Sequence, residues 1–191
     1  IYRTLMIIPW AFPSIVIALS WKWILNGVSG FIPNILVQLG ICNELPQFLS
    51  DNSFVFLTLI FINIWFGAPM IMVNVLSALQ TIPQDQYEAA QIDGAGKWTK
   101  LFKVTIPMMM PSITICMFLS LTNGFKLFDQ NLSLTAGEPS KMSEMMALNI
   151  FNTFYGRTGW EGVGQAKAVI FFIIVAVIAL AQNRLTRSKE V

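Results

Sequence analysis

The sequence predicts an all-α integral membrane protein, a polytopic bundle of helices that cross the bilayer several times. Of its 191 residues, 55% are hydrophobic and only 12% are charged, whereas a soluble domain usually carries about 25% charged residues. The mean hydropathy is +0.63, and the apolar residues occur in long continuous runs. The strands of a β-barrel would alternate apolar and polar residues instead, so the pattern favours helices.

Four apolar segments are long enough to cross a hydrocarbon core, which takes about 20 residues of helix. They cover approximately residues 2–25, 54–79, 107–123 and 166–182. The first contains Pro9 and Pro13, and the second is interrupted at Gly67-Ala68-Pro69. We therefore expect one membrane domain over residues 1–191 with four crossings. Ile1 is not a start methionine, and the chain opens directly in apolar sequence, so we expect a fragment without its true N-terminus.

Basic residues predict the orientation of these helices, because lysine and arginine near the ends of a span favour the cytoplasm. Residues 26–53 contain no lysine or arginine, whereas residues 80–104 contain three lysines. The C-terminal tail is also basic, with Arg184, Arg187 and Lys189. Loop 80–106 and the C-terminus are therefore expected on the cytoplasmic side.

Shorter elements are predicted between the spans. Residues 30–39 have the apolar spacing of an interfacial helix, and residues 142–155 that of an amphipathic helix. Gly137 and Pro139 indicate a turn over residues 135–140.

The polar loop between the second and third spans has features of a docking helix. Pro83 suits a helix start, where its missing N–H costs nothing, and Gly94 suits the left-handed position after the helix. A second amphipathic segment over residues 97–104 carries Lys97, Lys100 and Lys103 on one face, with Trp98, Leu101 and Phe102 able to anchor on the membrane or the bundle. From the residues alone, two interpretations are equally open: a docking element, or a loop whose lysines only set the orientation of the helices in the membrane.

The same loop resembles the Glu-Ala-Ala loop of ABC importer permeases. The matching positions are Glu88, Ala89, Ala90, Asp93, Gly94, Ala95, Phe102, Ile106, Pro107 and Pro111. Ile106 stands where leucine is usual. The resemblance implies that a short coupling helix docks in a cleft on an ATPase subunit and transmits nucleotide-driven closure to the membrane helices. The docking residues it implies are Glu88, Ala89, Ala90, Asp93, Gly94, Ala95, Phe102 and Pro107.

Further stretches extend the resemblance to six-helix carbohydrate permeases over essentially the whole chain. They are Arg3-Thr4-Leu5, Pro9-Trp10, Trp21-Lys22-Trp23 with Asn26, Phe125-Lys126-Leu127-Phe128-Asp129, and Leu134-Thr135-Ala136-Gly137-Glu138-Pro139. The resemblance implies four of the six transmembrane helices of a type I ABC importer permease, the first two being absent. It also implies import of a sugar or oligosaccharide through the cytoplasmic membrane of a prokaryote.

The resemblance implies several partners in the lipid bilayer and on both sides of it. A homologous second permease and two cytoplasmic ATPase subunits would assemble with this chain, and an extracytoplasmic solute-binding protein would deliver the sugar. ATP and Mg²⁺ would be bound in the partner ATPase, so this chain would be a non-catalytic subunit without a cofactor of its own.

Polar residues inside two spans form stripes that suit a sugar pathway. Asn63, Phe66, Gly67 and Met70 lie at i, i+3, i+4 and i+7, and Ser120, Asn123 and Gly124 form a similar stripe. Amides and hydroxyls pair with sugar hydroxyls, and an aromatic ring packs on the C–H face. In the family these positions lie in the middle of the translocation path. Interhelical hydrogen bonding is the alternative reading of the same residues.

Several classes of chemistry are disfavoured. Gly94-Ala95-Gly96-Lys97 lacks the earlier glycine and the following Ser or Thr of a phosphate-binding loop. The chain has no histidine, no carboxylate pair in a span, and a net charge of only +2, so catalysis, metal binding and nucleic-acid binding are not expected. The remaining alternatives are an ABC permease for another solute such as an amino acid or phosphate, an ATP-independent carrier, and an adaptor without a pathway.

Overall fold

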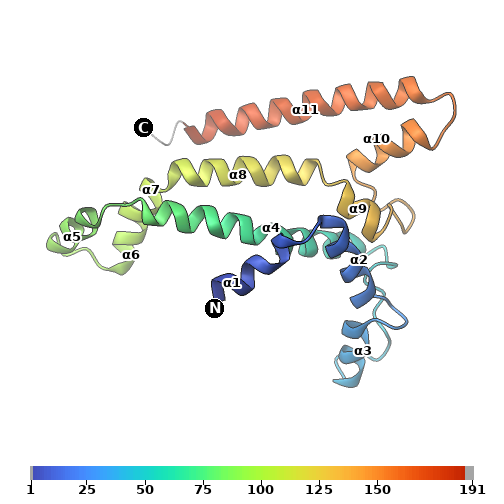
Figure 1. The fold of residues 1–191 in the computed structure, drawn as a ribbon, viewed down its shortest axis with the longest axis horizontal. Coiled ribbons are helices and arrows are strands. Elements are labelled where there is room, and N and C mark those ends of the chain that lie inside the picture. The colour runs from blue at the N-terminus through green and yellow to red at the C-terminus, as the bar shows by residue number, and fades with distance from the viewer. Residues whose placement is uncertain (1, 188–191) are drawn as a thin grey trace.

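The computed structural model describes residues 2–187, which form helices joined by turns and loops, with no β-strand among them (Figure 1). Ile1 and the basic Lys189 lie outside the described residues. The helices are α1 (Tyr2–Ile7), the 3₁₀ turn η1 (Ile8–Ala11), α2 (Ser14–Ile24), α3 (Phe31–Gln38), α4 (Val55–Gln80), α5 (Gln84–Ile92), α6 (Lys97–Lys100), the π-helical turn η2 (Leu101–Thr105), α7 (Ile106–Met108), α8 (Met110–Phe125), α9 (Asp129–Leu134), α10 (Met146–Tyr155) and α11 (Glu161–Arg187). The predicted all-α fold class is confirmed.

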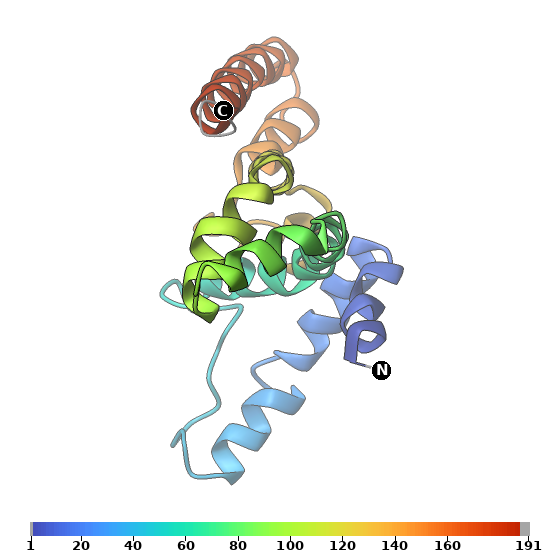
Figure 2. The same cartoon turned by 90° about the vertical axis from the view of Figure 1, so that its left-hand side faces the viewer.

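Three long helices, α4, α8 and α11, run along the length of the molecule, and α8 packs against both of the others (Figures 1 and 2). Helices α4 and α11 are each long and apolar enough to cross a membrane, with mean hydropathies of 2.0 and 2.4 over their most apolar 18 residues. Few of their residues are buried within the chain. Phe172 is 71% and Leu180 64% exposed, as suits helices that face lipid or a partner subunit.

The first predicted span is not one straight helix. Segments Arg3–Ala11 and Ser14–Ile24 are bent by 102° with respect to each other. Phe12, between them, is extended with φ −101° and ψ 148°, because a residue that precedes a proline is pushed out of the helical region. Pro13 therefore breaks the segment, and α2 turns away from α1 (Figure 1).

The second predicted span is more regular than the sequence indicated. Helix α4 continues through Gly67 and Pro69 without a break, and Pro69 is buried, so the predicted interruption was wrong. The third predicted span also differs in outline, since α8 begins at Met110 and reaches Phe125. The segment before it, Lys97–Met108, meets α8 at an angle of 67°, next to Pro107 and Pro111.

The shorter predicted elements are largely confirmed. Helix α3 occupies the expected segment, and the turn after α9 contains Gly137 at φ +91°. Helix α10 begins at Met146 rather than at residue 142, and α11 extends beyond residues 166–182 at both ends. The sequence reading missed α9, a six-residue helix that packs against α2.

Two small hydrophobic clusters hold the helices together. The first joins α2, α4 and α9 through Ala18, Leu25, Leu59, Ile62 and Leu134. Trp21 packs beside it, edge-on to Trp65 at a centroid distance of 5.3 Å. The second cluster, called here the root cluster, consists of Ala78, Ile82 and Met109 and lies where α4 ends and α8 begins.

Candidate functional site

The loop between α4 and α8 folds as the sequence predicted. Pro83 caps α5 in an extended conformation, Asp85 lies in the first turn, and the helix ends at Ile92. Gly94 has φ +78°, a left-handed conformation that glycine adopts without steric cost. The loop therefore contains a short, self-capped helix at one end of the molecule (Figure 1).

Every residue that the sequence assigned to docking lies on or next to this short helix or the segment after it. Helix α5 has no buried residue. Glu88, Ala89, Asp93, Gly94, Phe102 and Pro107 are exposed, and Ala90 and Ala95 are half-buried. An exposed helix with small side chains leaves a surface that another molecule can approach closely.

The aromatic residues of the loop do not anchor it to the bundle. Trp98 is 73% exposed and Phe102 61% exposed. Their rings stack on each other with centroids 6.2 Å apart and planes at 19°. The sequence left the membrane and the bundle open as anchors for these side chains. Their exposure excludes the bundle, and anchoring in the membrane stays a prediction. Their apolar faces remain available to lipid or to a partner.

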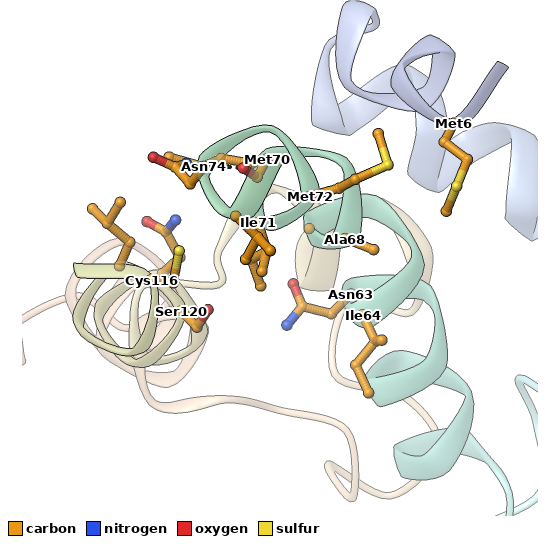
Figure 3. Close-up of a pocket in the computed structure, with 14 residues that line it drawn as sticks. Met6, Asn63, Ile64, Ala68, Met70, Ile71, Met72, Asn74, Cys116 and Ser120 are labelled. Atoms are coloured by element: carbon orange, nitrogen blue, oxygen red, sulfur yellow. Dashed lines mark hydrogen bonds between the residues drawn. The ribbon is translucent and has the colours of Figure 1, made fainter. Parts of the chain in front are cut away.

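A cavity of about 480 Å³ opens between α4 and α8. Its polar lining residues are Asn63, Asn74, Ser120 and Asn123, and its other lining residues are Met6, Ile64, Gly67, Ala68, Met70, Ile71, Met72, Val75, Cys116 and Leu119. Figure 3 shows Asn63 on α4 and Ser120 on α8 facing the same space. Met6, which belongs to α1, lies across α4 from Ser120. The lining is neutral and mixes amide, hydroxyl and apolar groups.

The amides of this cavity differ in how they are engaged. Asn74 donates to the carbonyl of Met70 within its own helix at 2.8 Å, as the dashed line in Figure 3 marks. Among the hydrogen bonds of the described residues, none involves the side chains of Asn63, Ser120 or Asn123. These three groups are therefore free to bind a ligand with hydroxyl groups, and they are not used as bonds between α4 and α8.

A second cavity of about 300 Å³ adjoins the first toward α9. Both are lined by Asn63, Gly67, Met70 and Asn123, and the second adds Phe66 and the charged Lys126 and Asp129. The structure thus brings six of the seven predicted pathway residues around two adjoining cavities. Gly124 lines neither cavity, although it is next to Asn123.

Gln130 is a residue of the second cavity that the sequence reading did not single out. It is 2% exposed, and neither its amide nitrogen nor its amide oxygen has a hydrogen-bond partner. An unpaired buried amide is costly. No sequence signal distinguishes Gln130, because its burial depends on the packing of α9 against α2.

A polar network between α10 and α11 was also missed. Lys167, inside the predicted fourth span, donates to Asn149 Oδ1 and Thr153 Oγ1, both at 2.8 Å. Glu144 accepts from Asn149 at 3.0 Å and from Asn152 at 2.7 Å. Partial burial raises the pKa of Glu144, but these bonds and the charges of nearby lysines outweigh it and hold that pKa below its ordinary value.

Comparison with known proteins places the whole chain in one family. Residues 1–191 match the family described as binding-protein-dependent transport system inner membrane component. The chain is 37% identical over 189 residues to the probable starch degradation products transport system permease protein of Thermoanaerobacterium thermosulfurigenes, covering 99% of this chain and 63% of that protein. It is 29% identical to the trehalose/maltose transport system permease protein of Thermococcus litoralis, over 100% of this chain and 63% of that protein.

Two further matches agree. The maltose/maltodextrin transport system permease protein of Escherichia coli is 30% identical over 99% of this chain and 38% of that protein. A solved bacterial ABC transporter involved in the import of the acidic polysaccharide alginate superposes with a TM-score of 0.86 at 22% identity, over 98% of this chain and 65% of that chain. The latter match shows the fold. The chain thus spans about 63% of the length of the first two relatives.

Proposed function

We infer that this chain, which belongs to the family of binding-protein-dependent transport system inner membrane components, is a permease subunit of an ATP-driven importer for a sugar or oligosaccharide. The observation that carries the proposal is that one loop joins the two helices that line the cavity, and that this loop presents the exposed helix α5. Movement of α5 would therefore act directly on the cavity between α4 and α8.

The chemistry of the larger cavity supports a sugar as the solute. Its unengaged amide and hydroxyl groups can pair with sugar hydroxyls, and its apolar residues suit the C–H faces of the rings. The larger cavity has no charged lining residue, and the adjoining one has one cation and one anion, Lys126 and Asp129. The absence of a net charge disfavours phosphate or an amino acid with a net charge. Its volume of about 480 Å³ is within the usual range for small-molecule sites, and the relatives named for starch products, trehalose and maltose agree.

In the proposed cycle this chain itself is not catalytic. Two separate ATPase subunits bind ATP and Mg²⁺, close on nucleotide binding, and move α5. The tilt of α4 and α8 then opens the cavity to one side of the membrane, and hydrolysis returns it to the other. Loop 80–106 and the C-terminus face the cytoplasm in this arrangement, as the lysines of the loop favour.

The proposal includes two further partners besides the ATPase subunits. A homologous second permease covers the open side of the cavity, and an extracytoplasmic solute-binding protein delivers the sugar. The description of the family as binding-protein-dependent supports the latter partner. A solved transporter with the same fold was crystallised with a periplasmic protein bound to an alginate pentasaccharide. This complex also supports a solute-binding partner.

Glu88→Lys in the full-length assembled complex tests the docking half of the proposal. Glu88 is exposed, so the variant should fold but lose ATP-dependent uptake, with the ATPase subunits dissociated or hydrolysing ATP without transport. Gln86→Lys, at an exposed position on the same helix outside the predicted docking set, is the matched control. Normal uptake and normal ATPase binding in Glu88→Lys would reduce the loop to a charged connector and favour an ATP-independent carrier.

Asn63→Leu combined with Asn123→Leu tests the cavity. Uptake should fall at least tenfold across a panel of neutral oligosaccharides, while the ATPase subunits remain bound. Leucine is close in size to asparagine, so the cavity keeps its shape and loses its hydrogen-bonding groups. Intact uptake of every sugar by the double variant would favour an adaptor, or a pathway elsewhere. A change confined to phosphate or amino acid uptake would identify a different solute.

A further inference from the structure

Tyr87 is the residue of α5 that connects the exposed helix to the rest of the molecule. Its ring is half-buried and packs against the root cluster, which brings together the end of α4 and the start of α8. Its neighbour Glu88 faces outward. One turn of helix therefore presents a docking residue on one side and contacts both cavity-lining helices on the other.

The hydroxyl of Tyr87 makes a second connection. Its Oη lies 3.1 Å from the Oγ1 of Thr105, a residue that is 8% exposed. Thr105 Oγ1 also lies 3.3 Å from the carbonyl oxygen of Lys100, to which it donates. Either hydroxyl can donate in the first bond; when Thr105 gives its single hydrogen to the Lys100 carbonyl, Tyr87 is the donor. Phenylalanine at position 87 would keep the ring and remove only this donor.

The backbone around Thr105 is unusual at the same point. Residues Leu101–Thr105 form a π-helical turn, a rare conformation that frequently occurs at functional sites. The carbonyl that Thr105 binds belongs to the residue five positions earlier, as the wide turn allows. Four residues beyond the turn, at Met109, the helix bends by 67° into α8. Met109 is itself a member of the root cluster.

The root cluster borders the space between α4 and α8. Val75 packs against the cluster and also lines the larger cavity. Ile113 packs against it from α8, two helical turns before Ser120 on the same helix. A displacement of Tyr87 can therefore reach the cavity through Val75 on α4, which packs against the cluster and lines the cavity.

We propose that Tyr87 is a positioning residue that, through its hydrogen bond to Thr105 and its ring in the root cluster, makes the bend at Met109 follow the movement of α5. The proposal rests on the proposed function and adds to it the contact by which docking changes the cavity. Docking itself depends on the exposed face of α5, so the two roles are separable by mutation.

Tyr87→Phe, Thr105→Val and the double variant test this role in the full-length complex reconstituted in vesicles. Each single variant should retain its ATPase subunits and their ATP hydrolysis, but transport at least threefold less sugar per ATP hydrolysed. The double variant should be no worse than Thr105→Val, because that variant already lacks the bond that Tyr87→Phe removes. Tyr155→Phe is the matched control, since Tyr155 is 73% exposed and lies on α10.

Cys116 provides a readout that does not depend on transport. It lines the larger cavity on α8, and the only other cysteine is Cys42. In a Cys42→Ser background, ATP should change the alkylation rate of Cys116 in the otherwise wild-type complex, and Tyr87→Phe should remove most of that change. An undiminished ATP effect in Tyr87→Phe, or loss of its ATPase subunits, would overturn the positioning role.

Failure of the proposed function gives a different result. In that case the wild-type complex would show neither ATP-dependent uptake nor an ATP effect on Cys116, and the positioning role would be overturned with it. An ATP effect on Cys116 without uptake of any sugar tested would instead retain the ATP-driven movement and overturn only the choice of solute.

Discussion

Helices α5 and α6 of loop 80–106 lie at the opposite end of the molecule from segment 129–153 (Figure 1), and the two regions differ in whether their polar residues are buried. Helices α5 and α6 of the loop have no buried residues. In the other segment several polar side chains are buried: Gln130, Asn131, Thr135, Ser143 and Thr153. Except for Gln130, these residues are hydrogen-bonded within the chain.

Asn131 shows how the self-contained segment works. Its side chain is fully buried, donates to the carbonyl of Ser143 at 2.7 Å and accepts from the backbone N–H of Met145 at 3.0 Å. These bonds span 12 and 14 residues, so one amide fixes the turn that precedes α10. Internal hydrogen bonds of this kind hold a segment in one conformation without a partner. An exposed short helix instead leaves its side chains available for contact with another molecule.

The largest expected effect follows from Gly94→Val. Valine at φ +78° is strained by about 1–2 kcal/mol, and the end of α5 should shift, lowering ATP-dependent uptake at least tenfold. No atom lies within 4 Å of the added Cβ, so the chain should still fold. Gly40→Val is the matched control, with φ +70° and equally open surroundings outside the loop. Equal uptake by both variants would contradict a special role for the loop.

Asn131→Leu should give the largest loss of stability. It leaves the Ser143 carbonyl and the Met145 N–H unpaired in a buried region, at about 1–3 kcal/mol for each group. A lower thermal midpoint of the purified protein in detergent would measure the effect. Asn52→Leu, at an exposed position, should change the midpoint little. A similar midpoint in both variants would show that the segment does not depend on its internal bonds.

Gln130→Leu should act in the opposite direction. Replacing an unpaired buried amide by an apolar side chain of similar size should stabilise the protein by about 1 kcal/mol, and the thermal midpoint should rise. Gln130→Glu, which buries a charge, should lower it. If leucine destabilises the protein, Gln130 has a hydrogen-bond partner in solution. In that case all the buried polar side chains of the segment are hydrogen-bonded.

The smallest effect concerns pH. Because the pKa of Glu144 is lowered in the folded protein, its carboxylate contributes stability above the ordinary pKa of 4.5, and this contribution declines as pH falls below that value toward the folded pKa. The difference in thermal midpoint between wild type and Glu144→Gln should therefore be constant near neutral pH and shrink in acid. A difference that does not change with pH would show that shape alone, not charge, matters at this position.

The loop could be predicted well because its signals are local. Pro83 at the start and Gly94 after the end act within one short helix, and the structure contains both features where they were expected. The exposure of Trp98 could not be predicted in this way, since an amphipathic pattern does not tell whether anything covers its apolar face.

The candidate cavity could be predicted only in part. Helical spacing placed Asn63, Gly67 and Met70 on one stripe of α4, and the structure shows these residues around one space. Spacing within a helix cannot say which stripe of α8 faces this space. Ser120 and Asn123 line it, and Gly124, which lines neither cavity, stays a prediction. Gln130 was missed because its burial requires contact between α9 and α2, which are more than 100 residues apart in the sequence.

The sequence by itself determined the helical membrane class, the main apolar segments and the capped helix in the loop, because composition, hydropathy and capping act over a few neighbouring residues. Only the tertiary structure decided that α4 continues through Pro69, that α9 packs against α2, and that Lys167 contacts Asn149 and Thr153. Those outcomes depend on which helices pack together, and packing joins residues that no local pattern relates.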